Sequence, residues 1–146
     1  RVDNGVNYSN SALSYYFNEP SLNDLKNYVL SDKVFNKVGG SWSVNPEGKL
    51  CVVYQTNENG YNARSFEDAF IHLNRDFVNS NKDVFRGLKS KRYFDDGNKD
   101  AYELASECIL KKTYFAMDII FHTDKNYSNW QIPAYIKDGL LWLKKD

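Results

Sequence analysis

Residues 50–77 read LCVVYQTNENGYNARSFEDAFIHLNRDF and contain the two patterns that decide the fold. Leu50 to Tyr54 form an apolar, β-branched run, which predicts a strand. From Phe66 onward, apolar side chains recur at the spacing of an amphipathic helix that reaches Phe77. A loop over residues 56–63 connects the two. We therefore expect an α/β domain, rich in helix, with a small sheet centred on residues 50–55.

Further elements are predicted on both sides of this unit from apolar spacing, caps and turn signals. Before it, we expect a short helix from Ser11 that ends before Pro20, and a second helix over 22–30 with Ser21 as N-cap. A hairpin around residues 42–48 is expected to lead into the strand at residue 50. After it, a long helix over 100–121 and a last helix following Pro133 are expected, and the helices beginning near residues 66 and 100 are expected to pack on the sheet.

Composition bounds the class of protein. The chain has 146 residues and a mass of 17.0 kDa, so we expect residues 1–146 to form a single domain. A hydrophobic content of 42% and an aromatic content of 16% exclude a disordered or low-complexity chain. Nineteen basic and 19 acidic residues give no net charge, so any contact with nucleic acid must be local.

Cysteine and histidine are scarce. Cys51 and Cys108, with two histidines in the chain, are too few for a disulfide framework or a four-ligand zinc site. We expect free thiols in a reducing compartment, a cytoplasmic location and no membrane contact, because the apolar runs are short. The chain begins with Arg1 and its sole methionine is Met117, so we expect a processed chain or part of a longer protein.

Common catalytic motifs are absent: the sequence has no glycine-rich phosphate loop, GxSxG or HExxH. Asp68, His72 and Asp76 are spaced at i, i+4 and i+8, which fits metal ligands on one helix face; a solvated polar face is the favoured interpretation. A basic cluster with aromatic neighbours fits either phosphate contacts or a solvated loop. It consists of Arg86, Lys89, Lys91 and Arg92.

Lys112 interrupts the pattern of the predicted 100–121 helix. The apolar stripe of that helix requires an apolar residue at position 112, where the sequence has lysine. A lysine on a buried stripe either snorkels at the edge of the core or directs its ammonium group into an active site. In the second case it would meet phosphate or carboxylate oxygens.

Three segments carry a family resemblance. The stretch from Tyr54 to Phe70 resembles the strand–loop–helix that carries a metal-binding glutamate in the TOPRIM nuclease domain of the OLD-family ATP-dependent endonucleases. Lys112-Thr113-Tyr114-Phe115-Ala116 resembles the Lys-x-x-Phe-Ala helix of that family, and residues 132–140 resemble the end of the same domain. The segments follow the family's order over residues 50–146.

The resemblance implies a helix-rich TOPRIM-like fold with a small, mainly parallel sheet. It implies a DNA endonuclease used in phage defence, dependent on Mg²⁺ or Mn²⁺. An N-terminal ABC-type ATPase domain, not in this chain, would be its partner and the route by which ATP acts, and a homo-oligomer is a further expectation. By position, Glu67 would be a catalytic metal ligand, Asp68 a weaker candidate ligand, and Lys112 would stabilise charge beside the scissile phosphate. Candidate DNA contacts are Arg64, Arg86, Lys89, Lys91 and Arg92.

The Asp-x-Asp pair that the family carries upstream has no counterpart in residues 1–54. Two-metal hydrolysis needs several carboxylates, so we expect this chain to be the C-terminal part of the nuclease domain. Alone, it is expected to be catalytically silent and to bind Mg²⁺ weakly. The alternative is a non-catalytic nucleic-acid-binding or protein-interaction domain on the same scaffold. An ATPase and an Asp-x-Asp pair upstream in a longer protein would favour the nuclease.

Overall fold

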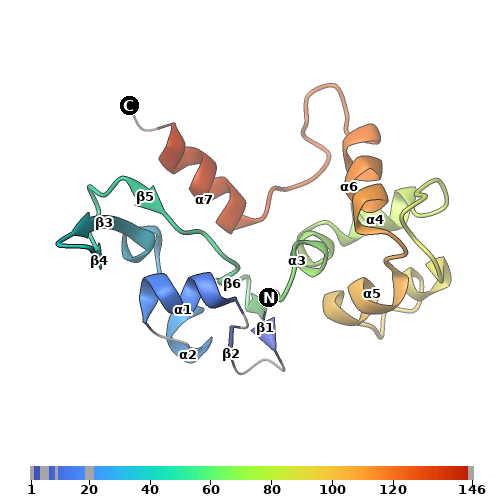
Figure 1. The fold of residues 1–146 in the computed structure, drawn as a ribbon. Helices are drawn as coiled ribbons and strands as arrows, with labels where there is room; N and C mark the ends of the chain where they lie inside the picture. Colours follow the sequence, from blue (N-terminus) through green and yellow to red (C-terminus); the bar gives the residue numbers. More distant parts are fainter. Residues whose placement is uncertain (1, 4–6, 9, 19–21, 145–146) are drawn as a thin grey trace. The chain divides into compact units, whose positions relative to one another are not determined.

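The structure, a computed structural model, describes residues 2–3, 7–8, 10–18 and 22–144. It is mixed α/β and has more helix than strand, which confirms the coarse prediction. The chain divides into two compact units (Figure 1): residues 1–65 together with 134–146 form the first, and residues 66–133 form the second.

The first unit contains short strands and helices and the last helix of the chain. Its elements are β1 (Val2–Asp3), β2 (Asn7–Tyr8), α1 (Ser11–Phe17), α2 (Leu22–Leu25), the 3-10 helix η1 (Leu30–Lys33), β3 (Val34–Val38), β4 (Ser41–Val44), β5 (Leu50–Cys51), β6 (Asn57–Glu58), β7 (Tyr61–Asn62) and α7 (Ala134–Leu143). The helices expected from Ser11 and after Pro133 are confirmed. The helix predicted over 22–30 ends at Leu25, and its proposed N-cap, Ser21, lies outside the described residues.

The sheet around residue 50 is antiparallel, so the expectation of a mainly parallel sheet is wrong. Its strand order is β4-β3-β5, and β3 pairs antiparallel with both neighbours. The connections explain this result: β3 and β4 are joined by Gly39 and Gly40, both at positive φ, whereas parallel strands need a crossover of about a dozen residues or more. The sheet is therefore a hairpin with a third strand added.

The strand predicted over 50–54 is mostly not a strand. Of these residues, Leu50 and Cys51 (β5) pair with β3, after which Val52 N donates one further hydrogen bond to Lys33 O at 2.9 Å. The central strand is β3, which the sequence analysis missed, and the predicted pairing of residues 42–44 with the strand at 50 is wrong because β3 lies between them. Tyr54 instead enters the core and donates its hydroxyl hydrogen to Leu25 O at 2.9 Å.

Residues 56–63 form a hairpin rather than the predicted loop. Strands β6 and β7 pair across Asn59 and Gly60, which both have positive φ, the conformation that an Asn-Gly turn favours. The carboxylate of Glu58 accepts a hydrogen bond from Ala134 N, at 3.0 Å to Oε2. This hairpin therefore caps the start of α7 and anchors the last helix in the first unit.

The second unit is helical. Its elements are α3 (Phe66–Leu73), α4 (Arg75–Asn81), the 3-10 helix η2 (Lys91–Phe94), α5 (Ala101–Cys108) and α6 (Lys112–Phe121). Asp100 begins α5 with a capping box, accepting a hydrogen bond from Glu103 N at 2.8 Å while its own N donates to Glu103 Oε2 at 2.9 Å. The predicted start of this helix is confirmed.

Two predicted helices are each broken in two, so both predictions are wrong in extent. The 66–77 helix stops at Leu73, because Asn74 turns away to bind Gln131, 57 residues along the chain. The 100–121 helix stops at Cys108, because Ile109 forms an antiparallel bridge with Leu88. At the second break a long-range hydrogen bond replaces the next helical one, because Leu110 N donates to Gly87 O at 2.7 Å. At the first break Asn74 N still donates to Phe70 O at 2.9 Å, and its side chain makes the long-range bonds. In both places tertiary contacts override helical periodicity.

Phenylalanines form the centre of the second unit. The ring centroid of Phe115 on α6 lies 6.0 Å from that of Phe70 on α3 and 6.1 Å from that of Phe85. Both pairs of rings meet edge-on. Phe70, Phe85 and Phe115 are almost fully buried. Each contributes a large apolar area to the core, so the ring contacts fix how α3 and α6 meet.

Candidate functional site

Glu67 and Asp68 lie in the first turn of α3, where carboxylates interact favourably with the helix dipole. Both are buried, Glu67 with 7% and Asp68 with 0% of their surface exposed. Buried carboxylates are costly unless they are paired or hydrogen-bonded. Both carboxylates therefore need hydrogen-bond or ion-pair partners at the start of α3.

Glu67 is paired with Lys112, the other residue that the resemblance assigned to catalysis. Lys112 Nζ lies 2.8 Å from Glu67 Oε2, although the two residues are 45 positions apart. The pair is asymmetric: 9% of the Glu67 side chain is exposed and 71% of the Lys112 side chain. The glutamate is held by its surroundings, whereas the lysine reaches it from the surface.

The phenylalanine core explains why this pair forms. Phe70 follows Glu67 by three residues on α3, and Phe115 follows Lys112 by three residues on α6. Residues three apart share a helix face, so the Phe70–Phe115 ring contact brings the beginnings of the two helices together. The ion pair is thus positioned by apolar packing one turn further along each helix.

The reasoning that singled out Lys112 from periodicity is wrong. Lys112 does not occupy a buried stripe, because α6 begins at this residue and the chain before it is extended. The buried side chains of α6 are Phe115, Asp118 and Ile119. The exposed lysine therefore has no need to snorkel, and its partner is a carboxylate of another helix.

The donor set does not by itself fit a metal ion. Among the residues that the structure describes, no three His, Cys, Asp or Glu side chains are grouped to hold one. Glu67 and Asp68 are successive residues and point about 100° apart around α3. A Mg²⁺ or Mn²⁺ site at Glu67 would need further carboxylates, and the expectation of a partial site stays a prediction.

The row of Asp68, His72 and Asp76 does not form one helix face. The break at Asn74 separates α3 from α4, so Asp76 belongs to a different helix from the other two. Asp68 is fully buried, which also makes the favoured interpretation, a solvated polar face, wrong for that residue. The row forms neither a ligand set nor a uniform surface.

The predicted DNA contacts are distributed over both units. Arg64 belongs to the first unit and the other four residues to the second. Arg86, Lys89 and Arg92 are exposed, whereas Lys91 is half-buried and donates to Asp83 O at 3.0 Å. Their role in binding phosphate stays a prediction.

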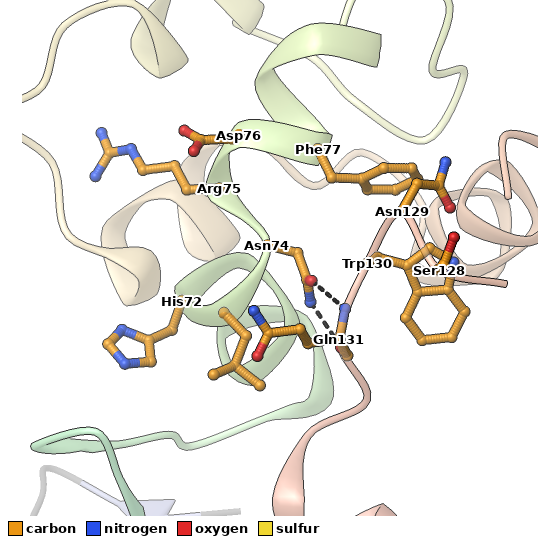
Figure 2. Close-up of a pocket in the computed structure, with 10 residues that line it drawn as sticks. His72, Asn74, Arg75, Asp76, Phe77, Ser128, Asn129, Trp130 and Gln131 are labelled. Atoms are coloured by element: carbon orange, nitrogen blue, oxygen red, sulfur yellow. Dashed lines mark hydrogen bonds between the residues drawn. The ribbon is translucent and has the colours of Figure 1, made fainter. Parts of the chain in front are cut away.

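Asn74 is an organising residue that the sequence analysis missed. Its Nδ2 donates to Phe70 O at 3.0 Å and to Gln131 O at 2.9 Å, and its Oδ1 accepts from Gln131 N. Figure 2 shows the two bonds between Asn74 and Gln131 at one side of a pocket that also includes Trp130. An asparagine within an apolar helical pattern was the available signal, since its amide competes with backbone hydrogen bonding.

Lys33, in the first unit, is a second residue that the sequence analysis missed. Only 1% of its surface is exposed, and its Nζ lies 4.9 Å from the centroid of the Tyr54 ring. Burial lowers the pKa of Lys33, and the nearby Asp138 and Cys51 oppose this in part. Burial also raises the pKa of the Cys51 thiol. Both Cys51 and Cys108 are free.

Comparison of the chain with protein-family models, characterised proteins and solved structures finds no match. In the part of the chain that the structure describes, every helix is too short or too polar to cross a bilayer.

Proposed function

We propose that this chain forms part of a metal-dependent DNA endonuclease that hydrolyses phosphodiester bonds, similar to the OLD-family ATPase-nucleases. The observation that carries the proposal is the 2.8 Å contact between Lys112 and Glu67. The resemblance selected these two residues from separate segments, and the fold brings them together.

The chemistry of the pair suits phosphodiester hydrolysis. Such a reaction needs carboxylates that organise the site and a cation that offsets charge developing on the phosphate. Glu67 is held in place by burial, and preorganised groups are the ones that contribute to catalysis. Lys112 is largely exposed, so an incoming phosphate has access to its ammonium group.

The proposal requires groups that this sequence does not contain. One buried carboxylate with a lysine does not hold two metal ions, so Mg²⁺ or Mn²⁺ would be bound jointly with carboxylates from another segment. ATP would act through an ABC-type ATPase domain of the same longer protein, and a homo-oligomer belongs to the same proposal. A role in phage defence is part of the same proposal through the resemblance, and a cytoplasmic location is part of it through the cysteine usage and the short apolar runs.

A non-catalytic nucleic-acid-binding or protein-interaction domain is the second candidate. The same ion pair favours it, because a lysine that bridges the starts of α3 and α6 also serves to join two helices. The nuclease and the non-catalytic domain predict different effects when the charges of Lys112 and Glu67 are removed. A structural pair affects stability, whereas a catalytic pair affects cleavage in a protein that remains folded.

Cleavage of supercoiled plasmid with Mg²⁺ or Mn²⁺, by a longer protein that includes the ATPase and upstream segments, tests the proposal. Lys112→Met and Glu67→Gln should each reduce cleavage by about 10²–10³-fold, the effect of losing one preorganised contact. The matched control is the ion pair of Lys99 and Glu107, 2.9 Å apart in the same unit. Lys99→Met and Glu107→Gln should leave cleavage unchanged, and full activity of folded Lys112→Met would end the proposal.

A further inference from the structure

Two segments of the second unit run antiparallel and carry exposed cations. Lys89 N donates to Cys108 O at 2.8 Å, and Leu110 N donates to Gly87 O at 2.7 Å, on either side of the Leu88–Ile109 bridge. Residues 86–89 therefore lie beside residues 108–111, immediately before α6. This pairing places Arg86 and Lys89 next to the segment that leads into Lys111 and Lys112.

The cations of this surface are available to a ligand. Arg86, Lys89 and Lys111 are all exposed, and Lys111 Nζ lies 4.9 Å from the centroid of the Tyr114 ring. Within the described part of the chain, Arg86 and Lys89 make no ion pair or side-chain hydrogen bond. Lys82 and Lys99 of the same unit differ, because Asp95 and Glu107 neutralise them.

Three acidic groups of this unit are already engaged. Glu107, at the end of α5, pairs with Lys99, and Glu67 pairs with Lys112. Asp118 is buried and accepts a hydrogen bond from Gly87 N at 2.7 Å. The exposed charge along residues 86–89 and 111 is therefore positive, although the chain as a whole is neutral.

We propose that Arg86, Lys89 and Lys111 form a surface that binds the sugar-phosphate backbone of DNA and leads it to the pair of Lys112 and Glu67. This inference rests on the proposed function and names the substrate-binding surface of the same site. Arg86 lies in a turn and Lys89 in a bend, on either side of the Leu88–Ile109 bridge. Lys111 adds a third cation from the adjacent segment.

The surface recognises the charge of the DNA backbone and not the base sequence. Exposed lysine and arginine side chains bind phosphate oxygens and release counterions, which makes the affinity strongly dependent on salt. With a slope of about −0.9 per contact, each contact contributes about fivefold in affinity at 0.15 M salt, and three contribute about 10²-fold.

The test measures binding of the 146-residue chain to a fluorescein-labelled 20-base-pair duplex by anisotropy between 50 and 200 mM KCl. The test variant carries Arg86→Gln, Lys89→Gln and Lys111→Gln. The control variant removes the same charge elsewhere in the unit, with Lys82→Gln, Lys99→Gln and Lys125→Gln. Circular dichroism verifies that each variant is folded. If the triple variant does not fold, the three single substitutions are measured instead, and each is expected to weaken binding about fivefold.

The expected result is an affinity loss of about 10²-fold for the test variant, with a salt slope about 2.7 smaller, and a much smaller change for the control. Equal losses in both variants, or no salt-dependent DNA binding by the chain at 50 mM KCl, would overturn the inference. If polyglutamate binds as tightly as DNA, competes with it and depends on the same three residues, the surface would be assigned to an acidic protein instead. Cleavage by Glu67→Gln tests the nuclease proposal separately, because that variant retains the basic surface.

Discussion

Gly87→Ala tests the contact on which the second unit depends. A Cβ atom at this position would lie 2.2 Å from Phe115 N, 2.5 Å from Phe115 Cα and 2.8 Å from the carbonyl carbon of Tyr114. These are backbone atoms in the first turn of α6, so no side-chain rotation relieves the overlap. The φ of Gly87 is not in the left-handed region. Any cost of alanine therefore comes from close packing and not from backbone conformation.

The size of the effect follows from the distances. Ordinary contacts of a Cβ atom begin at 3.4 Å, so α6 and residue 87 must separate by more than about 1 Å. Overpacking of this kind costs about 1–3 kcal/mol. The separation also lengthens the 2.7 Å hydrogen bond from Gly87 N to the buried Asp118 carboxylate, which contributes about 1.5–3 kcal/mol. We expect a loss of about 3–5 kcal/mol, a large share of the stability of a small domain.

Urea unfolding followed by the Trp130 indole resonance measures this loss in the second unit. The indole Nε1 of Trp130 donates to Thr123 Oγ1 at 2.9 Å, so its chemical shift reports on that unit. Gly97→Ala is the matched control, because a Cβ atom there meets nothing within 4 Å. The control should change stability by less than about 0.5 kcal/mol. A Gly87→Ala protein as stable as the control would refute the packing of residues 86–89 on α6.

Three further substitutions test other parts of the fold. Lys33→Met should stabilise the first unit by about 1 kcal/mol at pH 7 in thermal unfolding, by removing a buried charge. Because burial lowers the pKa of Lys33, the unfolded chain binds more protons than the folded chain between that lowered pKa and 10.5. The stability of the wild-type protein should therefore rise with pH over this interval, and the same pH dependence in Lys33→Met would contradict the argument. Asn74→Ala should cost about 2–3 kcal/mol and speed hydrogen exchange of the Gln131 amide; unchanged exchange would count against the link. Asp100→Ala should cost about 1 kcal/mol in thermal unfolding through loss of its bond from Glu103 N, and no change would mean that the cap is unimportant.

Local signals predicted the helix starts well. The helix expected from about residue 100 begins at Ala101 behind its cap Asp100, and the helices beginning near Ser11 and after Pro133 form where the sequence places them. A cap or a proline acts on its own backbone within a few residues, so its effect is readable without knowledge of the fold. Helix ends were less predictable, because the residues that ended α3 and α5 bind partners far along the chain.

The pairing of the strands could not be predicted from the sequence. Strand β3 shows no clean alternation, since Val34 and Phe35 are both buried and the residues after them become progressively exposed. The best apolar run, from Leu50, contributes just two paired residues. A strand's register is set by its partners, and the parallel arrangement came from the family resemblance rather than from these residues. The turn pairs Gly39-Gly40 and Asn59-Gly60 were the signals that favoured antiparallel hairpins.

The candidate site was reached by two lines of reasoning that fared differently. Periodicity placed Lys112 on a buried stripe of one long helix, and that helix is broken at Ile109 by its bridge with Leu88. The same break makes Lys112 the first residue of α6, at the exposed beginning of the helix, where its ammonium group meets Glu67. Had the helix continued, the turn before Phe115 would have belonged to its interior. The interruption that contradicts the periodicity argument is thus the structural reason that the cation is both accessible to solvent and within hydrogen-bonding distance of a buried carboxylate.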